Sequence, residues 1–216
     1  MDEKNYWQLG TWGRIPVAMH WTVLLVFAWM YLWFGTVAMT LVASAALFFV
    51  MAVHEMGHVF ALKRRKVAIE NITFFGVHGT TAHAYAGPGA EIAVAWAGVG
   101  AQLLLLAATL ILFPLVDLST IAFAPSVLGV TYLVFTRVNV FLMVIALIPI
   151  GPFDGRAAWG VFAYMKSVRR RKRREKQELL LNPERALTPE RRRELEESSS
   201  QAAAQLLGKL SGRKEE

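Results

Sequence analysis

Two histidines and a glutamate stand together inside a long apolar stretch. His54, Glu55 and His58 form the pattern His-Glu-x-x-His. On a helix, residues four apart project from one face, so the two imidazoles can bind one Zn²⁺ ion. Glu55 lies beside them and can accept a proton from the hydrolytic water. The pattern predicts a hydrolytic zinc site, and the alternative interpretation is a polar turn at a helix end.

A third ligand has to come from elsewhere in the chain. Catalytic zinc usually takes three protein ligands and leaves one position for water. The chain has no cysteine, so a thiolate ligand is excluded. Asp154, at the end of a segment rich in Pro and Gly, is the candidate, although an Asp before a Gly is also typical of a turn. We predict a zinc site of His54, His58 and Asp154, with Glu55 as the base.

The composition indicates a membrane protein. The chain has 216 residues, of which 55% are hydrophobic and 12% aromatic, which is too apolar for a soluble domain of this size. Ionisable side chains within a membrane helix are costly and therefore indicate function. This cost weakens the interpretation of the His-Glu-x-x-His pattern as a simple turn.

Apolar segments divide the first three quarters of the chain. We expect an uncleaved first helix over 17–34 and further spans over 36–62 and 91–115. The return over 125–150 is less regular. The predicted fold class is an all-α polytopic membrane protein with about four transmembrane helices, drawn from five or six hydrophobic segments.

The fourth segment carries an arginine and ends in helix-breaking residues. An arginine at mid-bilayer costs about 2.5–3.5 kcal/mol on insertion scales, so we expect Arg137 near the outer interface and 127–135 on the outer side or partly inserted. Pro149, Gly151 and Pro152 should break the helix. Unwound backbone at membrane depth has to line a cavity or lie within the protein.

Basic residues cluster at 63–66 and 166–174, directly after apolar segments. This placement follows the positive-inside rule, whereas 117–124 has no Lys or Arg and suits an outer loop. We therefore expect cytoplasmic termini and an active site toward the cytoplasmic side. The net charge of +7 is explained by anchoring and contact with membrane lipid rather than by nucleic acid.

Two regions flank or interrupt the helices. Glycines punctuate 67–89, which predicts short extended segments in a membrane-associated, β-hairpin-like loop. Residues 167–216 form a charged, helical cytoplasmic tail with helix starts at Pro183 and Pro189. The predicted domains are a membrane-embedded domain over 1–166 and this tail.

The motifs resemble those of the site-2 protease family of intramembrane zinc metalloproteases. That family pairs His-Glu-x-x-His with a later Pro-rich segment ending in Asp-Gly, here Asp154-Gly155. Weaker similarities lie at 13–21 and at Ala97-Gly98. The resemblance implies hydrolysis of a peptide bond in or near a transmembrane segment of another membrane protein. It also implies that the loop over 67–89 dips into the membrane and pairs with unwound substrate as an added strand.

Three positions depart from the family pattern. Ala146 stands where an Asn is common, Val99 replaces a Pro, and Gln102 replaces another Asn. Gln102 keeps an amide and could support substrate or the transition state, whereas Ala146 cannot. A pseudoprotease that binds membrane partners therefore remains an alternative. A zinc transporter is a weaker alternative because such carriers need more spans and a second helix bearing His and Asp.

The other histidines receive separate predictions. His20, beside Trp21, should pack at the membrane interface. His78 or His83 could supply a gating or inhibitory fourth zinc ligand, but this is the less favoured interpretation of these two histidines. The compact plan suggests a prokaryotic plasma membrane.

Overall fold

The computed structural model describes residues 5–115, 124–151, 153–181 and 189–211. The chain divides into two compact units, Met1–Tyr164 and Met165–Glu216. The elements in order are β1 (Tyr6–Trp12), β2 (Ile15–His20), α1 (Val23–Phe34), α2 (Val37–Arg64), β3 (Ile69–Phe75), β4 (His78–His83), α3 (Pro88–Leu112), a 3-10 turn η2 (Phe113–Leu115), α4 (Ala124–Leu133), a π-helical segment η3 (Val134–Val138), α5 (Asn139–Ala146), α6 (Gly155–Leu181) and α7 (Pro189–Ser211).

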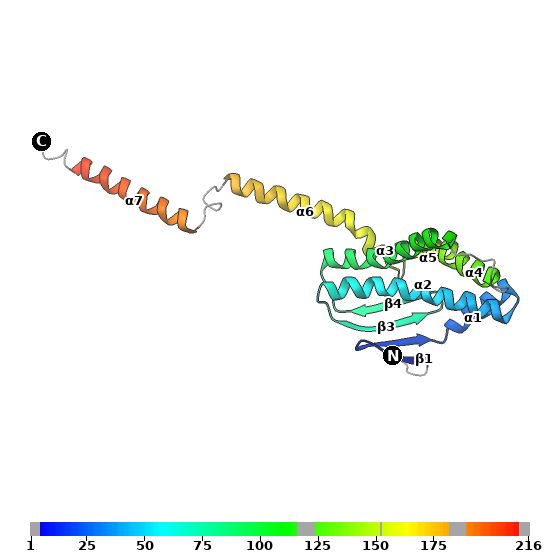
Figure 1. Ribbon diagram of the computed structural model, residues 1–216. Coiled ribbons are helices and arrows are strands. Elements are labelled where there is room, and N and C mark those ends of the chain that lie inside the picture. The colour runs from blue at the N-terminus through cyan, green and yellow to red at the C-terminus, as the bar shows by residue number, and fades with distance from the viewer. Residues whose placement is uncertain (1–4, 116–123, 152, 182–188, 212–216) are drawn as a thin grey trace. The chain divides into compact units, whose positions relative to one another are not determined.

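Helix α2 is the central element of the first unit. Gly35 ends α1 in the left-handed conformation, and the Thr36 side chain accepts a hydrogen bond from the Met39 backbone N–H to begin α2. In its most apolar window, 39% of α2 is buried, against 17% in each of the other two long apolar helices. In Figure 1, α2 lies between the sheet and α3. The helix that carries the His-Glu-x-x-His pattern is thus enclosed on two sides.

The small sheet has the order β1-β2-β3-β4. β1 pairs antiparallel with β2, β2 pairs parallel with β3, and β3 pairs antiparallel with β4. The β3–β4 hairpin lies within the predicted extended loop over 67–89 and confirms it. The sequence did not predict that β1 and β2 would extend this hairpin into a four-stranded sheet.

The expectation of a continuous first helix over 17–34 is wrong. Residues 15–20 form β2, and α1 has only 12 residues, a rise of about 18 Å against a hydrocarbon core of ~30 Å. β2 has partners on both sides, β1 and β3, which satisfy its backbone groups. An apolar run without polar alternation therefore forms a partly buried strand followed by a short helix.

Within the described part of the chain, three helical segments are long and apolar enough to cross a membrane: Val37–Arg64, Pro88–Leu115 and Ser126–Ala146. α1 is a shorter apolar helix. Large apolar side chains remain exposed on the protein surface, including Leu32 at 82% and Leu104 at 73%. Apolar exposure on this scale fits a lipid-facing surface. The segments support an integral membrane protein, although the predicted number of about four spanning helices is not confirmed.

The helix from α4 to α5 runs continuously through Arg137, without the separate outer segment expected over 127–135. The π-helical turn at 134–138 holds Arg137 on an exposed face and leaves Asn139 fully buried. Such π-helical turns often accompany functional positions. The membrane depth of Arg137 stays a prediction.

The predicted helix break before Asp154 is confirmed. α5 ends at Ala146, α6 begins at Gly155, and Gly151 has a φ of +64°. A Cβ atom on Gly155 would meet the backbone carbonyls of Leu147 and Ile148. The turn therefore needs glycine in order to fold back on α5 and present Asp154.

The hydrophobic core fills the space between α2 and the helices α1, α4 and α5. Its buried members are Val26, Met30, Ala43, Ala46, Leu47, Val50, Met51, Val134 and Leu142. This core occupies the half of α2 that precedes the histidines. It fixes α2 against the segment that leads to Asp154.

In the second unit, α7 begins with Pro189 at its first position, as predicted. The helix start expected at Pro183 lies outside the described residues. α6 carries the second basic cluster within one continuous helix.

Helices α2 and α3 approach each other most closely at a glycine. A Cβ atom on Gly57 would overlap the backbone carbonyl of Ala97 and lie 2.9 Å from Gly98 Cα. Such contact is possible only between small residues. It brings the backbone of α3 next to the two histidines of α2.

Gly57→Ala should therefore destabilise the first unit. Overpacking of this kind costs about 1–3 kcal/mol, which should appear as a lower thermal unfolding midpoint of the detergent-solubilised protein. Gly100→Ala on α3 is the matched control, since a Cβ atom there meets nothing within 4 Å. Equal midpoints for the two variants would contradict the close packing.

Candidate functional site

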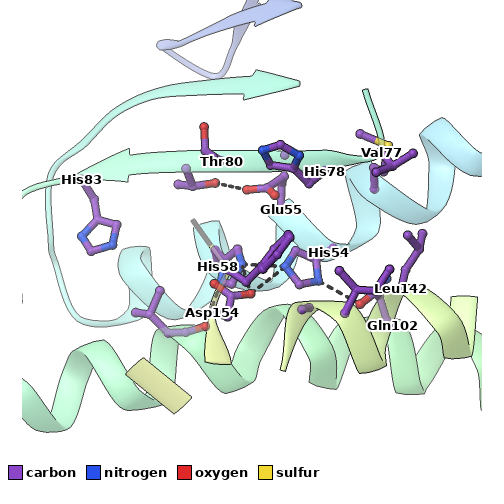
Figure 2. Close-up of a pocket in the computed structure, with 17 residues that line it drawn as sticks. His54, Glu55, His58, Val77, His78, Thr80, His83, Gln102, Leu142 and Asp154 are labelled. Carbon is purple, nitrogen blue, oxygen red and sulfur yellow. Dashed lines mark hydrogen bonds and ion pairs between the residues drawn. The ribbon is translucent and has the colours of Figure 1, made fainter. Parts of the chain in front are cut away.

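Three side chains from two distant segments meet at one point. His54 and His58 project from the same face of α2, and Asp154 comes from the turn before α6 (Figure 2). Asp154 Oδ2 lies 2.9 Å from His54 Nε2 and 3.2 Å from His58 Nε2, and the two Nε2 atoms are 2.9 Å apart. The structure thus brings together the three residues predicted as zinc ligands.

The opposite nitrogen of each ring fixes its tautomer. His58 Nδ1 lies 2.8 Å from the Val94 carbonyl oxygen, which can only accept a hydrogen bond. His54 Nδ1 lies 2.9 Å from Gln102 Oε1, which also accepts. Both rings therefore carry their proton on Nδ1, and both Nε2 atoms present a lone pair to the centre.

When both rings are neutral, three electron-pair donors face one another without a hydrogen atom between them. A single added proton can bridge one pair of these atoms, whereas a divalent cation can contact all three. Ligand atoms at ~2.0–2.1 Å from a tetrahedral zinc ion are about 3.3 Å apart, close to the observed 2.9–3.2 Å. The donor set of two imidazoles and a carboxylate fits Zn²⁺.

Gly98 on α3 leaves the space for this cluster. A Cβ atom there would lie 2.7 Å from both His54 Nε2 and His58 Cε1. The sequence indicated Ala97-Gly98 only as a weak family similarity. Its physical role is to let the α3 backbone lie directly against the two imidazoles.

Glu55 is buried beside the cluster, with 1% of its surface exposed. The nearest ligand atoms of His54, Glu55 and His58 all lie within 4.8 Å of one another, and these residues form a group able to hold a metal ion. Glu55 is rotated toward the sheet, where Thr81 Oγ1 donates a 2.6 Å hydrogen bond to Glu55 Oε2. The sequence gave no prediction for Thr81.

Gln102 lies against a candidate metal ligand, and its expected support of a substrate or transition state stays a prediction. Its side chain is almost fully buried, and its amide oxygen accepts from the His54 ring. Asn139 Nδ2 in turn donates to the Gln102 backbone carbonyl at 3.0 Å. Gln102 therefore orients a candidate metal ligand, and the sequence reasoning missed the supporting Asn139.

Burial and charge act in opposite directions on the ionisable groups around the site. Burial alone would raise the pKa of Asp154, but an imidazole of His54 or His58 that carries a second proton, on Nε2, more than reverses this through its hydrogen bond and charge and holds that pKa below its usual range. Asp154 thus offers an anionic oxygen. Burial lowers the pKa of His78, with partial opposition from the Glu55 carboxylate.

The cluster opens into a cavity of about 190 Å³. The α2 histidines and Glu55 form one wall, and the other walls come from β4, from α5 and from Phe153 beside Asp154. Ala146, the departure from the family pattern, also lines this cavity. A peptide reaching the three ligands would therefore pass between β4 and the end of α5.

The remaining histidines stay outside the three-atom cluster. The His20 ring packs near Tyr6, Trp21 and Phe75. His78 stacks on Phe75, with ring centroids 5.3 Å apart, and His83 Nε2 lies 3.8 Å from Glu91 Oε2. His78 and His83 line the cavity wall formed by β4.

A solved structure shares this arrangement of elements. The site-2 protease from Methanocaldococcus jannaschii superposes with a TM-score of 0.59, and the match covers 74% of this chain and 73% of that one, at 22% identity. The chain has the fold of a site-2 protease. This finding supports the family resemblance that the two metal motifs indicated. No protein-family model and no curated protein sequence matches the chain.

Gln102→Leu should weaken zinc binding without abolishing it. Loss of an outer partner of a metal-binding histidine typically costs about 10–100-fold in affinity. Competition with a chromogenic chelator measures this change, and Gln102→Glu, which keeps an acceptor oxygen, should bind more tightly than Gln102→Leu. Asp154→Ala should lose the site altogether. A wild-type zinc affinity in Gln102→Leu would show that the contact between Gln102 and His54 does not support zinc binding.

Proposed function

We propose that the chain is an intramembrane zinc metalloprotease that hydrolyses a peptide bond in or near a transmembrane segment of another membrane protein. The observation that carries this proposal is the convergence of His54 Nε2, His58 Nε2 and Asp154 Oδ2, with the Glu55 carboxylate beside them. The site-2 protease fold and the three long apolar helices support it.

Each residue has a distinct part in the proposed reaction. His54, His58 and Asp154 hold the zinc ion, which when bound polarises the scissile carbonyl and acidifies a water molecule. Glu55 accepts the proton of the attacking water and then delivers it to the leaving amine nitrogen. Burial of Glu55 keeps this carboxylate away from bulk water, where its proton would be lost to exchange.

The sheet gives the substrate a place to bind. β4 is an edge strand of the sheet, and it lines the cavity that contains Glu55. A transmembrane substrate has to unwind before its peptide bond is accessible, and its freed N–H and C=O groups need new partners in the membrane. Pairing as an added strand on β4 supplies these partners and extends the substrate past the three ligands.

A pseudoprotease remains the second candidate because of Ala146. This residue lines the cavity, and its methyl group offers no hydrogen bond to a substrate or to a developing oxyanion. A chain that binds unwound membrane partners without cutting them would keep the sheet edge and the cavity.

Glu55→Gln separates these two functions. The amide keeps the size of the side chain but removes a base whose proton transfer is worth roughly 10²–10⁴-fold in rate. We expect full zinc content with nearly abolished cleavage of single-span substrates reconstituted in proteoliposomes. Cleavage at the wild-type rate would eliminate Glu55 as the base. Wild-type protein that binds zinc and cuts none of a panel of substrates would favour the pseudoprotease.

The proposed orientation places both termini and the site toward the cytoplasm of a prokaryotic plasma membrane. Because the chain has no cysteine, single cysteines at Arg65, Leu115 and Ser199 can be read without background. An impermeant thiol reagent added to intact cells should label only Leu115, which ends the α3 segment. Permeabilised cells, in which all three positions should react, are the control. Outside labelling at Arg65 or Ser199 would reverse the orientation.

A further inference from the structure

The contact between β4 and the proposed base is close and directional. Thr81 Oγ1 donates to Glu55 Oε2 at 2.6 Å, a short hydrogen bond typical of a charged acceptor. Among the residues that the structure describes, no second side-chain hydrogen bond to the Glu55 carboxylate is found. The orientation of this carboxylate therefore depends on one strand of the sheet.

Gly79, two residues earlier on β4, faces the same carboxylate. A Cβ atom there would lie 2.7 Å from both Cγ and Cδ of Glu55, so any larger residue would displace the side chain. Alternate residues of a strand share a face, and Gly79 and Thr81 of β4 both contact the Glu55 side chain. Glycine inside a strand often marks this kind of close approach.

We infer that Thr81 is a positioning residue that holds Glu55 in the orientation from which it accepts the proton of the attacking water. Gly79 provides the space in which Glu55 adopts this orientation. The inference rests on the proposed hydrolytic function. A free glutamate side chain samples several rotamers, and the observed one keeps a carboxylate oxygen within 4.8 Å of a ligand nitrogen of each histidine, close enough for one water molecule to lie between them. Without the Thr81 hydroxyl, the productive fraction falls while the metal ligands and the sheet stay in place.

Thr81→Val and Thr81→Ser test this role because they differ in the hydroxyl donor. Valine matches threonine in shape, so we expect kcat to fall about 10-fold or more, with KM and zinc content close to wild type. Serine should restore most of the rate. Thr73→Val on β3 is the matched control, since its hydroxyl donates to Asn71 Oδ1 within the sheet rather than to Glu55. It should cleave like wild type.

A double substitution shows whether Thr81 acts through Glu55. On a Glu55→Gln background, Thr81→Val should reduce the residual rate no further, because the base it orients is already gone. An equal further loss on both backgrounds would overturn the inference, as would a Thr81→Val protein with wild-type kcat. These results differ from failure of the proposed function, in which the wild type itself cuts nothing.

Hydroxamate binding tests the same role without any cleavage. A small hydroxamate that ligates zinc gives up its acidic proton on binding, and Glu55 is placed to accept it. Calorimetry on the zinc-loaded protein should show about 10-fold weaker binding for Thr81→Val and near-wild-type binding for Thr81→Ser. Equal affinity for wild type and Thr81→Val would contradict the positioning role even if no substrate is found.

Discussion

The convergence of three lone pairs on one point is the constraint on which the rest of the structure depends. His54, His58 and Asp154 present acceptor atoms to one another, an arrangement that repels unless a cation lies among them. Uncompensated polar groups within an apolar helix pair are costly. A bound cation would offset this cost at the centre, and partners for the outer ring nitrogens offset it there. Val94 and Gln102 provide those partners.

The packing around the three ligand atoms brings the backbone of neighbouring elements close to them. Gly57 and Gly98 let α2 and α3 touch, so the α3 carbonyl of Val94 reaches the His58 ring. On the opposite side, Gly79 lets β4 lie against Glu55. The site is thus enclosed by three glycine contacts, each of which a single methyl group would disturb. Small residues here serve the chemistry as well as the helix packing.

The three candidate metal ligands could be predicted from the sequence, whereas the residues that support them could not. Helical spacing alone places His54 and His58 on one face, and the Pro-rich approach to Asp154 marks the break that returns it to them. The strand over 15–20 was missed because its apolar residues have no alternation with polar ones, and pairing with β3 lies 50 residues away. Thr81 was missed because a lone threonine carries no signal until the partner of its hydroxyl is known. Gly79 did carry a signal in the sequence, since an isolated glycine within an extended segment indicates close backbone approach.

The contact between Glu55 and β4 affects how a substrate would be aligned with the base. The two functions that we assign to β4 use different parts of the same strand: its outer edge pairs with the substrate backbone, and its inner face holds Glu55 through Thr81. The substrate and the base then share one rigid reference, so a shift of the strand moves both together. Two separate loops would let the scissile bond and the proton acceptor drift independently, and misplacement of about 1 Å can cost 10²-fold in rate. One strand that pairs with the substrate and also orients Glu55 would therefore align the peptide bond with its base, within a chain of only 216 residues.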